Sequence, residues 1–217
     1  MSPLQKILLA FGAVLAVLGT LVAIDPALVW HGAPANDGQM ASTTNSAIPP
    51  GAPIGGAFQL TNQLSQKVSE ATYRGRFMLV FFGYSHCPDE CPLTLQKMAL
   101  AMQALGPLAR NVVPIFITID PARDTPDVLR AYLLKFDPEL VGLTGSRTQI
   151  AKVAHEYDVA FDANDAEASG ASVISHSTYI YLMGRNGRFL NLFPSSITAA
   201  QLTAVLKDQL SSWRGVA

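Results

Sequence analysis

The hydrophobic pattern divides the chain into an apolar N-terminal run, a more polar stretch and a long alternating region. Residues 7–24 form eighteen consecutive positions without a charge. At about 1.5 Å of rise per residue, a helix of this length nearly crosses a hydrocarbon core of roughly 30 Å. Residues 1–24 are therefore predicted to form a transmembrane anchor. Lys6, before the run, favours a cytoplasmic N-terminus with the rest of the chain outside.

A cleaved signal peptide is the alternative to an uncleaved anchor. Signal peptides have a shorter apolar region, of roughly 7–15 residues, followed closely by a small-x-small cleavage site. The best such site here, residues 33–35, lies well after the run and contains a proline. The segment also lacks the Arg- and Ser-rich character of a mitochondrial transit peptide. We therefore expect a single-pass protein of the bacterial inner membrane, with its soluble domain facing the periplasm.

Residues 25–56 differ in composition from the segments on either side. Five of the fourteen prolines and five of the sixteen glycines fall in this stretch, in which only Asp25 and Asp37 are charged. No apolar periodicity is sustained. We therefore expect a flexible tether that joins the anchor to a folded domain of residues 57–217.

Within residues 57–217, short apolar runs alternate with amphipathic segments. Continuous apolar runs at 77–82 and 112–119 predict strands that are buried on both faces. Pro114 in the second run indicates a strand start near an edge or a bulge. One helix is predicted over residues 92–105, and two more follow the capping residues Thr125 and Ser146.

The C-terminal part predicts a β-hairpin and a last helix. The hairpin strands are expected at 177–183 and 188–193, around an Asn-Gly turn, and Thr198 begins a capping box for the helix. Strand, helix, strand and helix followed by a hairpin and a helix indicate an α/β class. We expect a thioredoxin-like fold, with a central mixed sheet flanked by helices.

Charge and cysteine content narrow the possible functions. The chain carries 15 Lys and Arg against 16 Asp and Glu, a formal net charge of −1. Nucleic-acid-binding domains normally show a basic excess, so no nucleic-acid partner is expected. Two cysteines form neither a disulfide-dense scaffold nor a four-thiolate zinc site.

Both cysteines lie in one motif, directly after the first predicted strand. Cys87 and Cys91 are spaced C-x-x-x-C, and Pro92 is expected to start the helix, with Cys91 near its N-cap. The partial positive charge of a helix N-terminus stabilises a thiolate. Strand ends followed by helix starts are also where open α/β sheets present reactive groups.

Three interpretations fit two exported thiols at this place. A structural disulfide would close so short a loop that it gains little chain entropy. A redox dithiol matches the strand–cysteine–helix arrangement of thioredoxin-type proteins, although those use C-x-x-C. A soft metal held by both thiolates is the third interpretation, with Cu(I) preferred and zinc as a rival.

His176 is the candidate for a third metal ligand. It precedes the predicted hairpin, where thioredoxins place a cis-proline, and in a thioredoxin-like fold this connection lies close to the cysteine loop. A histidine before a strand is, on its own, more often a surface or capping residue. In combination with Cys87 and Cys91, it favours a metal site.

Four segments of the chain resemble the SCO/SenC family of copper-binding cytochrome oxidase assembly factors: GYSHCPDECPLTL, ITIDPARDTP, LVGLTG and SHSTYIYLMGRNGRF. The resemblance implies one copper ion, as Cu(I) or Cu(II), bound by Cys87, Cys91 and His176. It also implies a copper metallochaperone that delivers the ion to the dinuclear copper centre of cytochrome c oxidase. The implied partners are the copper-bearing subunit of the oxidase and other copper chaperones.

A second role at the same site is a thiol–disulfide oxidoreductase that reduces the cysteines of the oxidase centre before metallation. This enzyme activity needs Cys87 and Cys91 but not His176. The two roles are not exclusive, and the residues alone do not separate them.

Two more residues are expected to act near the metal without being its main ligands. The resemblance gives Asp124, in the DPARDTP segment, a role behind the ligands or a weak contact to Cu(II). His86, which adjoins Cys87, is expected to support the loop or tune the site. Asp120 and Arg123 of the same segment are expected to pair with each other.

Overall fold

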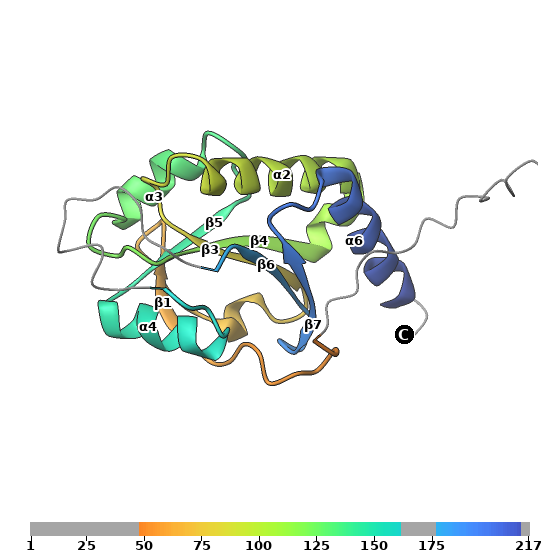
Figure 1. The fold of residues 1–217 in the computed structure, drawn as a ribbon, viewed down its shortest axis with the longest axis horizontal. Helices are drawn as coiled ribbons and strands as arrows, with labels where there is room; N and C mark the ends of the chain where they lie inside the picture. Colours follow the sequence, from red (N-terminus) through yellow and green to blue (C-terminus); the bar gives the residue numbers. More distant parts are fainter. Residues whose placement is uncertain (1–47, 162–176, 214–217) are drawn as a thin grey trace, which may run out of the picture. The chain divides into compact units, whose positions relative to one another are not determined.

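The structure is a computed structural model that describes residues 48–161 and 177–213 (Figure 1). The predicted anchor, the first part of the predicted tether and His176 lie outside the described residues. Within the described ranges, none of the helices combines the length and the apolar character needed to cross a bilayer.

A mixed seven-stranded sheet forms the centre of the domain, in the order β2-β1-β5-β4-β3-β6-β7. The inner strands β3, β4 and β5 are parallel, whereas β1, β2, β6 and β7 pair antiparallel with their neighbours. This arrangement confirms the predicted α/β class with a mixed sheet. The strands are β1 (Gln59–Asn62), β2 (Lys67–Ser69), β3 (Phe77–Gly83), β4 (Val112–Thr118), β5 (Val141–Thr144), β6 (Tyr179–Met183) and β7 (Phe189–Pro194).

The two central strands are buried along their whole length, as their continuous apolar runs predict. All seven positions of β3 and all seven of β4 are buried, because helices cover both faces of the sheet. β4 is an inner strand, but Pro114 pairs only with Leu79 of β3, since the pairing with β5 begins at Ile115. The proline therefore lies where β4 has a single neighbour, which agrees with its missing N–H.

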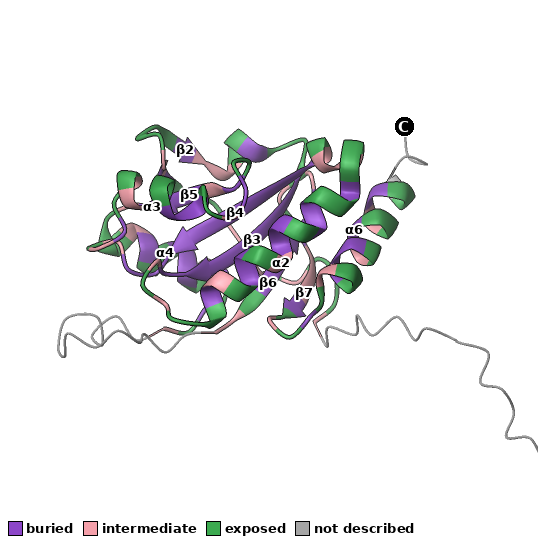
Figure 2. Cartoon of the chain, turned by 90° about the horizontal axis from the view of Figure 1, so that it is seen from above, coloured by how far each residue is buried: buried purple, intermediate pink, exposed green. Residues whose placement is uncertain are grey.

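Helices lie on both sides of the sheet (Figures 1 and 2). α2 (Glu90–Leu105) and α3 (Pro126–Leu133) cover one face, and α4 (Arg147–Glu156) covers the other. α6 (Ala199–Trp213) packs beside α2, and short 3-10 turns occupy η2 (Glu70–Tyr73) and η3 (Gly106–Asn111). Figure 2 shows that the helices turn their buried residues towards the sheet.

The predicted caps of three helices are present. The Thr125 hydroxyl accepts a hydrogen bond from the Val128 N–H at 3.4 Å, with Pro126 at the first helical position of α3. Ser146 and Gln149 form the expected capping box of α4. The Thr198 hydroxyl accepts from the backbone N–H three residues later, at 3.2 Å, at the start of α6.

α2 begins earlier than the sequence predicts. Its first residue is Glu90, with Asp89 at the N-cap, so that Cys91 lies in the first turn and Pro92 follows it. A proline fits here because the first N–H groups of a helix have no partner within the helix. The expected start at Pro92 is therefore wrong by two residues, and α2 itself holds Cys91.

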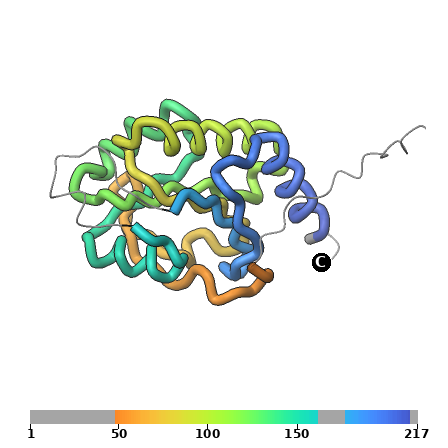
Figure 3. Tube along the Cα trace, viewed as in Figure 1, coloured from red at the N-terminus to blue at the C-terminus, as the bar shows by residue number. Residues whose placement is uncertain are grey.

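The sequence patterns missed three short strands and the packing of part of the tether. β1, β2 and β5 have three or four residues each, which is too short for a clear periodicity. Residues 48–56 run past β7 to the end of α4 (orange in Figure 3). There the Gly51 N–H donates to Phe189 O at 2.8 Å and the Gly55 N–H donates to Glu156 O at 2.6 Å.

The attachment of α2 to the sheet yields a testable prediction. Leu95 is fully buried against the core, whereas Leu100 on the same helix is 48 % exposed. Leu95→Ala is expected to lower the free energy of unfolding by about 3 kcal/mol, because it leaves a cavity. Leu100→Ala is the matched control, with an expected change within about 0.5 kcal/mol. Chemical denaturation measures both, and equal losses would contradict the described packing.

Candidate functional site: a dithiol at the edge of the sheet

Two loops meet where β3 and β4 end. Because these strands are parallel neighbours, their carboxyl ends lie at the same edge of the sheet. The Ile119 N–H donates to Gly83 O at 2.8 Å and joins the starts of the two loops. The loop after β3 carries Cys87, and the loop after β4 carries Asp124. This edge is where open α/β sheets generally place their ligands.

The two cysteines are in contact at the start of α2. The Cys91 N–H donates to Cys87 Sγ at 3.4 Å, and the Cys91 thiol shares a hydrogen bond with the Cys87 sulfur. The two are not joined by a disulfide bond. The N-cap residue Asp89 makes no capping hydrogen bond with its side chain to any described residue. The Cys87 sulfur thus accepts a hydrogen bond from one of the first-turn amides, which have no partner within the helix. An amide donor at a helix N-terminus stabilises a thiolate.

A hollow over β3 receives the Cys91 side chain. Cys91 is fully buried, and Cys87 is partly exposed. A Cβ atom added to Gly83 would lie 2.6 Å from Cys91 Sγ and 2.9 Å from Cε2 of Phe116. Both distances are shorter than van der Waals contact, so only a glycine at this position leaves room for the sulfur. The sulfur of Cys91 therefore packs directly on the backbone of β3.

The surroundings of Cys91 favour its protonated form. The hydrogen bond to Cys87 is the largest cause that raises the pKa of Cys91, and burial is the second. The charges of Cys87 and Asp124 raise this pKa further, while a hydrogen bond from the Tyr84 backbone lowers it. Two adjacent sulfurs with a buried carboxylate nearby do not readily carry two negative charges without a cation. The arrangement is thus suited to a ligand that supplies positive charge.

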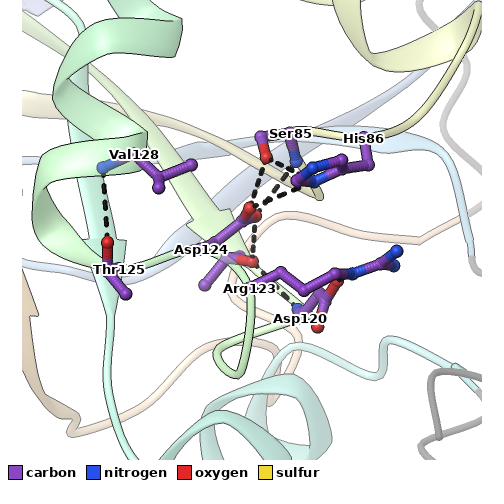
Figure 4. A network of polar contacts seen from close by, with 8 residues as sticks. Ser85, His86, Asp120, Arg123, Asp124, Thr125 and Val128 are labelled. Carbon is purple, nitrogen blue, oxygen red and sulfur yellow. Dashed lines mark hydrogen bonds and ion pairs between the residues drawn. The ribbon is translucent and has the colours of Figure 1, made fainter.

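The carboxylate of Asp124 ties the cysteine loop to the end of β4 (Figure 4). Asp124 is fully buried. It accepts hydrogen bonds from the Ser85 N–H at 3.0 Å, from the Ser85 hydroxyl and from the Thr118 hydroxyl at 2.6 Å. His86 Nδ1 lies 3.0 Å from the Ser85 hydroxyl oxygen and 4.0 Å from the Asp124 carboxylate. Asp124 therefore contacts the loop that carries Cys87 at Ser85 and, more distantly, at His86.

A second carboxylate holds the turn between β4 and α3. Asp120 is buried, and it accepts a hydrogen bond from Nε of Arg123, the expected pair. The Asp120 carbonyl accepts from the Asp124 N–H at 2.9 Å. Sequence reasoning missed Thr118, whose hydroxyl bridges the Asp124 carboxylate and the Asp120 N–H. A hydroxyl at the end of an otherwise apolar strand is the signal that could have found it.

The predicted third ligand, His176, lies outside the described residues. In the part of the chain that the structure describes, no three His, Cys, Asp or Glu side chains are grouped as a metal site. Ser177, the next residue, lies two positions before Tyr179, the first residue of β6. β6 is antiparallel to β3, with Ile180 opposite Phe81, so β6 starts at the edge of the sheet where the cysteine loop begins.

Sequence comparison identifies relatives of the whole domain. The family model of SCO1/SenC matches residues 46–211. The mitochondrial SCO1 homolog of Homo sapiens is 32 % identical over 163 residues, which cover 74 % of this chain and 54 % of the human protein. A SCO2-like protein of Rickettsia prowazekii is 34 % identical over 157 residues, which cover 72 % of this chain and 77 % of that protein. The chain thus spans about half of its human relative.

Solved structures give the same result. ScoI of Bradyrhizobium japonicum with copper bound matches with a TM-score of 0.66 and 42 % identity, over 71 % of this chain and 98 % of that one. Yeast Sco1 with copper bound matches with a TM-score of 0.67 and 31 % identity, over 73 % of this chain and 89 % of that one. On sequence and fold together, this chain belongs to the SCO1/SenC family.

Proposed function

We propose that the domain is a copper metallochaperone that binds one copper ion through Cys87, Cys91 and His176. The observation that carries the proposal is the contact between the Cys87 and Cys91 thiols at the start of α2. Relatives solved with copper bound support it at 42 % and 31 % identity. The ion is cargo, and its destination is the dinuclear copper centre in the copper-bearing subunit of cytochrome c oxidase.

The donor set agrees with copper in its reduced form. Thiolate sulfur is a soft ligand that selects Cu(I), and an imidazole nitrogen suits both oxidation states of copper. A bound cation also offsets the repulsion between the two charged sulfurs. Cys87 is partly exposed, so a partner protein, such as an oxidase subunit or another copper chaperone, has access to one of the two sulfurs.

The position of β6 supports His176 as the third ligand. Only one residue separates His176 from Thr178, whose backbone carbonyl accepts a hydrogen bond from the Ser195 N–H at 3.1 Å beside the start of β6. This start lies at the edge of the sheet that the cysteine loop occupies. A ligand from this connection would complete a site with two sulfurs and one nitrogen.

Residues 1–24 are proposed to anchor the domain in the bacterial inner membrane, with residues 25–56 as the tether and the domain in the periplasm. The uncharged run at 7–24 and the lysine before it support this topology. An anchored carrier is confined to the membrane surface at which the copper centre of the oxidase is assembled.

Copper titration tests the ligand set. Reduced protein is titrated with Cu(I) against a competing chelator, and Cys87→Ser and Cys91→Ser are each expected to lose about a hundredfold or more in affinity. His176→Ala is expected to lose about tenfold or more, since it removes a ligand atom. His155→Ala on the exposed face of α4 is the matched control and should bind like the wild type. Undiminished affinity in His176→Ala would remove that residue from the ligand set.

A thiol–disulfide oxidoreductase is the second candidate function, which the contact between the two thiols also favours. The test substrate is a peptide that contains the cysteines of the oxidase copper centre, joined in a disulfide. If copper transport is the main role, the metal-free His176→Ala variant is expected to reduce this disulfide far more slowly than a thioredoxin does. A rate that matches thioredoxin, and that vanishes in Cys87→Ser, would establish the reductase role instead. The rate is measured by mass spectrometry of the alkylated peptide.

Asp124 is proposed to position the cysteine loop rather than to bind copper. In Asp124→Asn, a carboxylate that only accepts hydrogen bonds is replaced by an amide whose NH₂ group can only donate. The NH₂ group would face the Ser85 N–H or the Thr118 hydroxyl, which are donors to the carboxylate in the wild type. It is expected to lower the free energy of unfolding by about 2–3 kcal/mol and to weaken Cu(I) binding about tenfold. Asp127→Asn, an exposed residue paired with Arg130, is the control and should change neither quantity. Loss of copper affinity without loss of stability would instead indicate that Asp124 contacts the ion.

A further inference from the structure

The end of the sheet opposite the dithiol gathers arginine side chains. Arg76 directly precedes β3, and Arg110 lies two residues before β4, whose first residue pairs with the first residue of β3. Arg185 and Arg188 lie between β6 and β7, and the Gly75 N–H donates to Arg185 O at 2.9 Å, which joins this turn to the start of β3. Five arginines share this end of the sheet, which we call the arginine edge: Arg74, Arg76, Arg110, Arg185 and Arg188.

Three of these arginines have no charged partner among the described residues. Arg74 is paired with Glu70 at 3.7 Å. Arg76, Arg110 and Arg188 are exposed, and none of them forms an ion pair with another residue in the described ranges. Their guanidinium groups are therefore open to a ligand from outside the domain.

The carboxylates at the arginine edge are fewer than the guanidinium groups. Arg76 and Arg110 line an open hollow together with Asp137 and Glu139. Asp137 is nearly buried and accepts a hydrogen bond from the Glu139 N–H at 2.8 Å. With Glu70, three carboxylates stand against five guanidinium groups, which leaves a surplus of two positive charges.

The edge that carries the cysteine loop has acidic groups instead. Asp89 and Glu90 are exposed at the start of α2. α2 runs from this edge towards the arginine edge (Figure 1). Its 16 residues measure about 24 Å. The domain thus has an acidic end with the two sulfurs and a basic end that lies away from them.

The chain enters the domain at the arginine edge. The Gly51 N–H donates to Phe189 O at 2.8 Å, and a Cβ atom added to Gly51 would lie 3.8 Å from Nη2 of Arg188. The uncharged run at 7–24 precedes this point in the sequence. A flexible chain of the 23 residues from 25 to 47 would span roughly 26 Å. The arginine edge would therefore stay within reach of a membrane that holds the run.

We propose that the arginine edge docks on the headgroups of anionic phospholipids, in the same membrane that holds the anchor, and so turns the dithiol away from the bilayer. Arginine suits this partner because its planar guanidinium group donates two parallel hydrogen bonds to phosphate oxygens. Basic residues are also attracted by the negative potential of an anionic bilayer surface. The tether keeps the local concentration of lipid high, so a weak contact is enough for docking. The inference rests on the anchor of the proposed function and does not depend on copper binding.

Hydrogen exchange of the metal-free full chain in lipid nanodiscs tests this docking. In discs that contain anionic phosphatidylglycerol, the amides of residues 106–111 and 184–188 are expected to exchange about fivefold more slowly than in discs of zwitterionic phosphatidylcholine, because docking limits their contact with water. The amides around Cys87 and Cys91 are expected to exchange equally in both. High salt screens exposed charges and should remove the difference.

Two triple variants separate a local contact from a general effect of charge. Removal of three charges from the arginine edge is expected to abolish the slower exchange: Arg76→Gln, Arg110→Gln and Arg188→Gln. The matched control removes three exposed charges from α3 and α4 and should preserve it: Arg130→Gln, Arg147→Gln and Lys152→Gln.

An equal loss of protection in the two triple variants would overturn the proposal. The wild-type chain distinguishes this inference from the proposed anchor. Failure of the wild type to insert into the discs would refute the anchor and the docking together. Insertion without slower exchange at the arginine edge would refute the docking alone.

Discussion

The hydrogen bonds of one buried carboxylate determine the geometry of the cysteine loop. Asp124 has no exposed surface, and it accepts from the backbone and the hydroxyl of Ser85 and from the hydroxyl of Thr118. These donors come from the ends of two neighbouring parallel strands. Because an unpaired carboxylate in this place would be costly, the loop after β3 and the loop after β4 are held together. The position of Cys87 follows from this contact.

Gly83 and the first turn of α2 determine how the two cysteine side chains lie relative to each other. Gly83 leaves the space that Cys91 Sγ fills, and the first turn of α2 directs the Cys91 amide at Cys87 Sγ. The result is a pair of adjacent thiols of which only Cys87 has contact with solvent. Charging both sulfurs is unfavourable without a cation. The same pair of thiols is therefore suited to both proposed roles, metal binding and disulfide chemistry.

Two groups around the sulfurs differ in what they contribute. Asp124 holds the loop that carries Cys87, and Gly83 leaves room for the Cys91 sulfur.

The sequence alone determined the local features that depend on residues close to one another along the chain. The apolar runs of β3 and β4, the caps at Thr125 and Ser146 and the C-x-x-x-C motif all depend on contacts within a few positions, and the structure reproduces these elements. The start of α2 was misplaced because a proline is tolerated anywhere in the first turn of a helix. Contacts between distant segments were decided only by the tertiary structure: the hydrogen bonds of Ser85 to Asp124, and the position of the Phe116 ring beside Gly83 and the Cys91 sulfur. Such contacts depend on which strands lie side by side, and strand order is a property of the whole fold rather than of any single stretch of the chain.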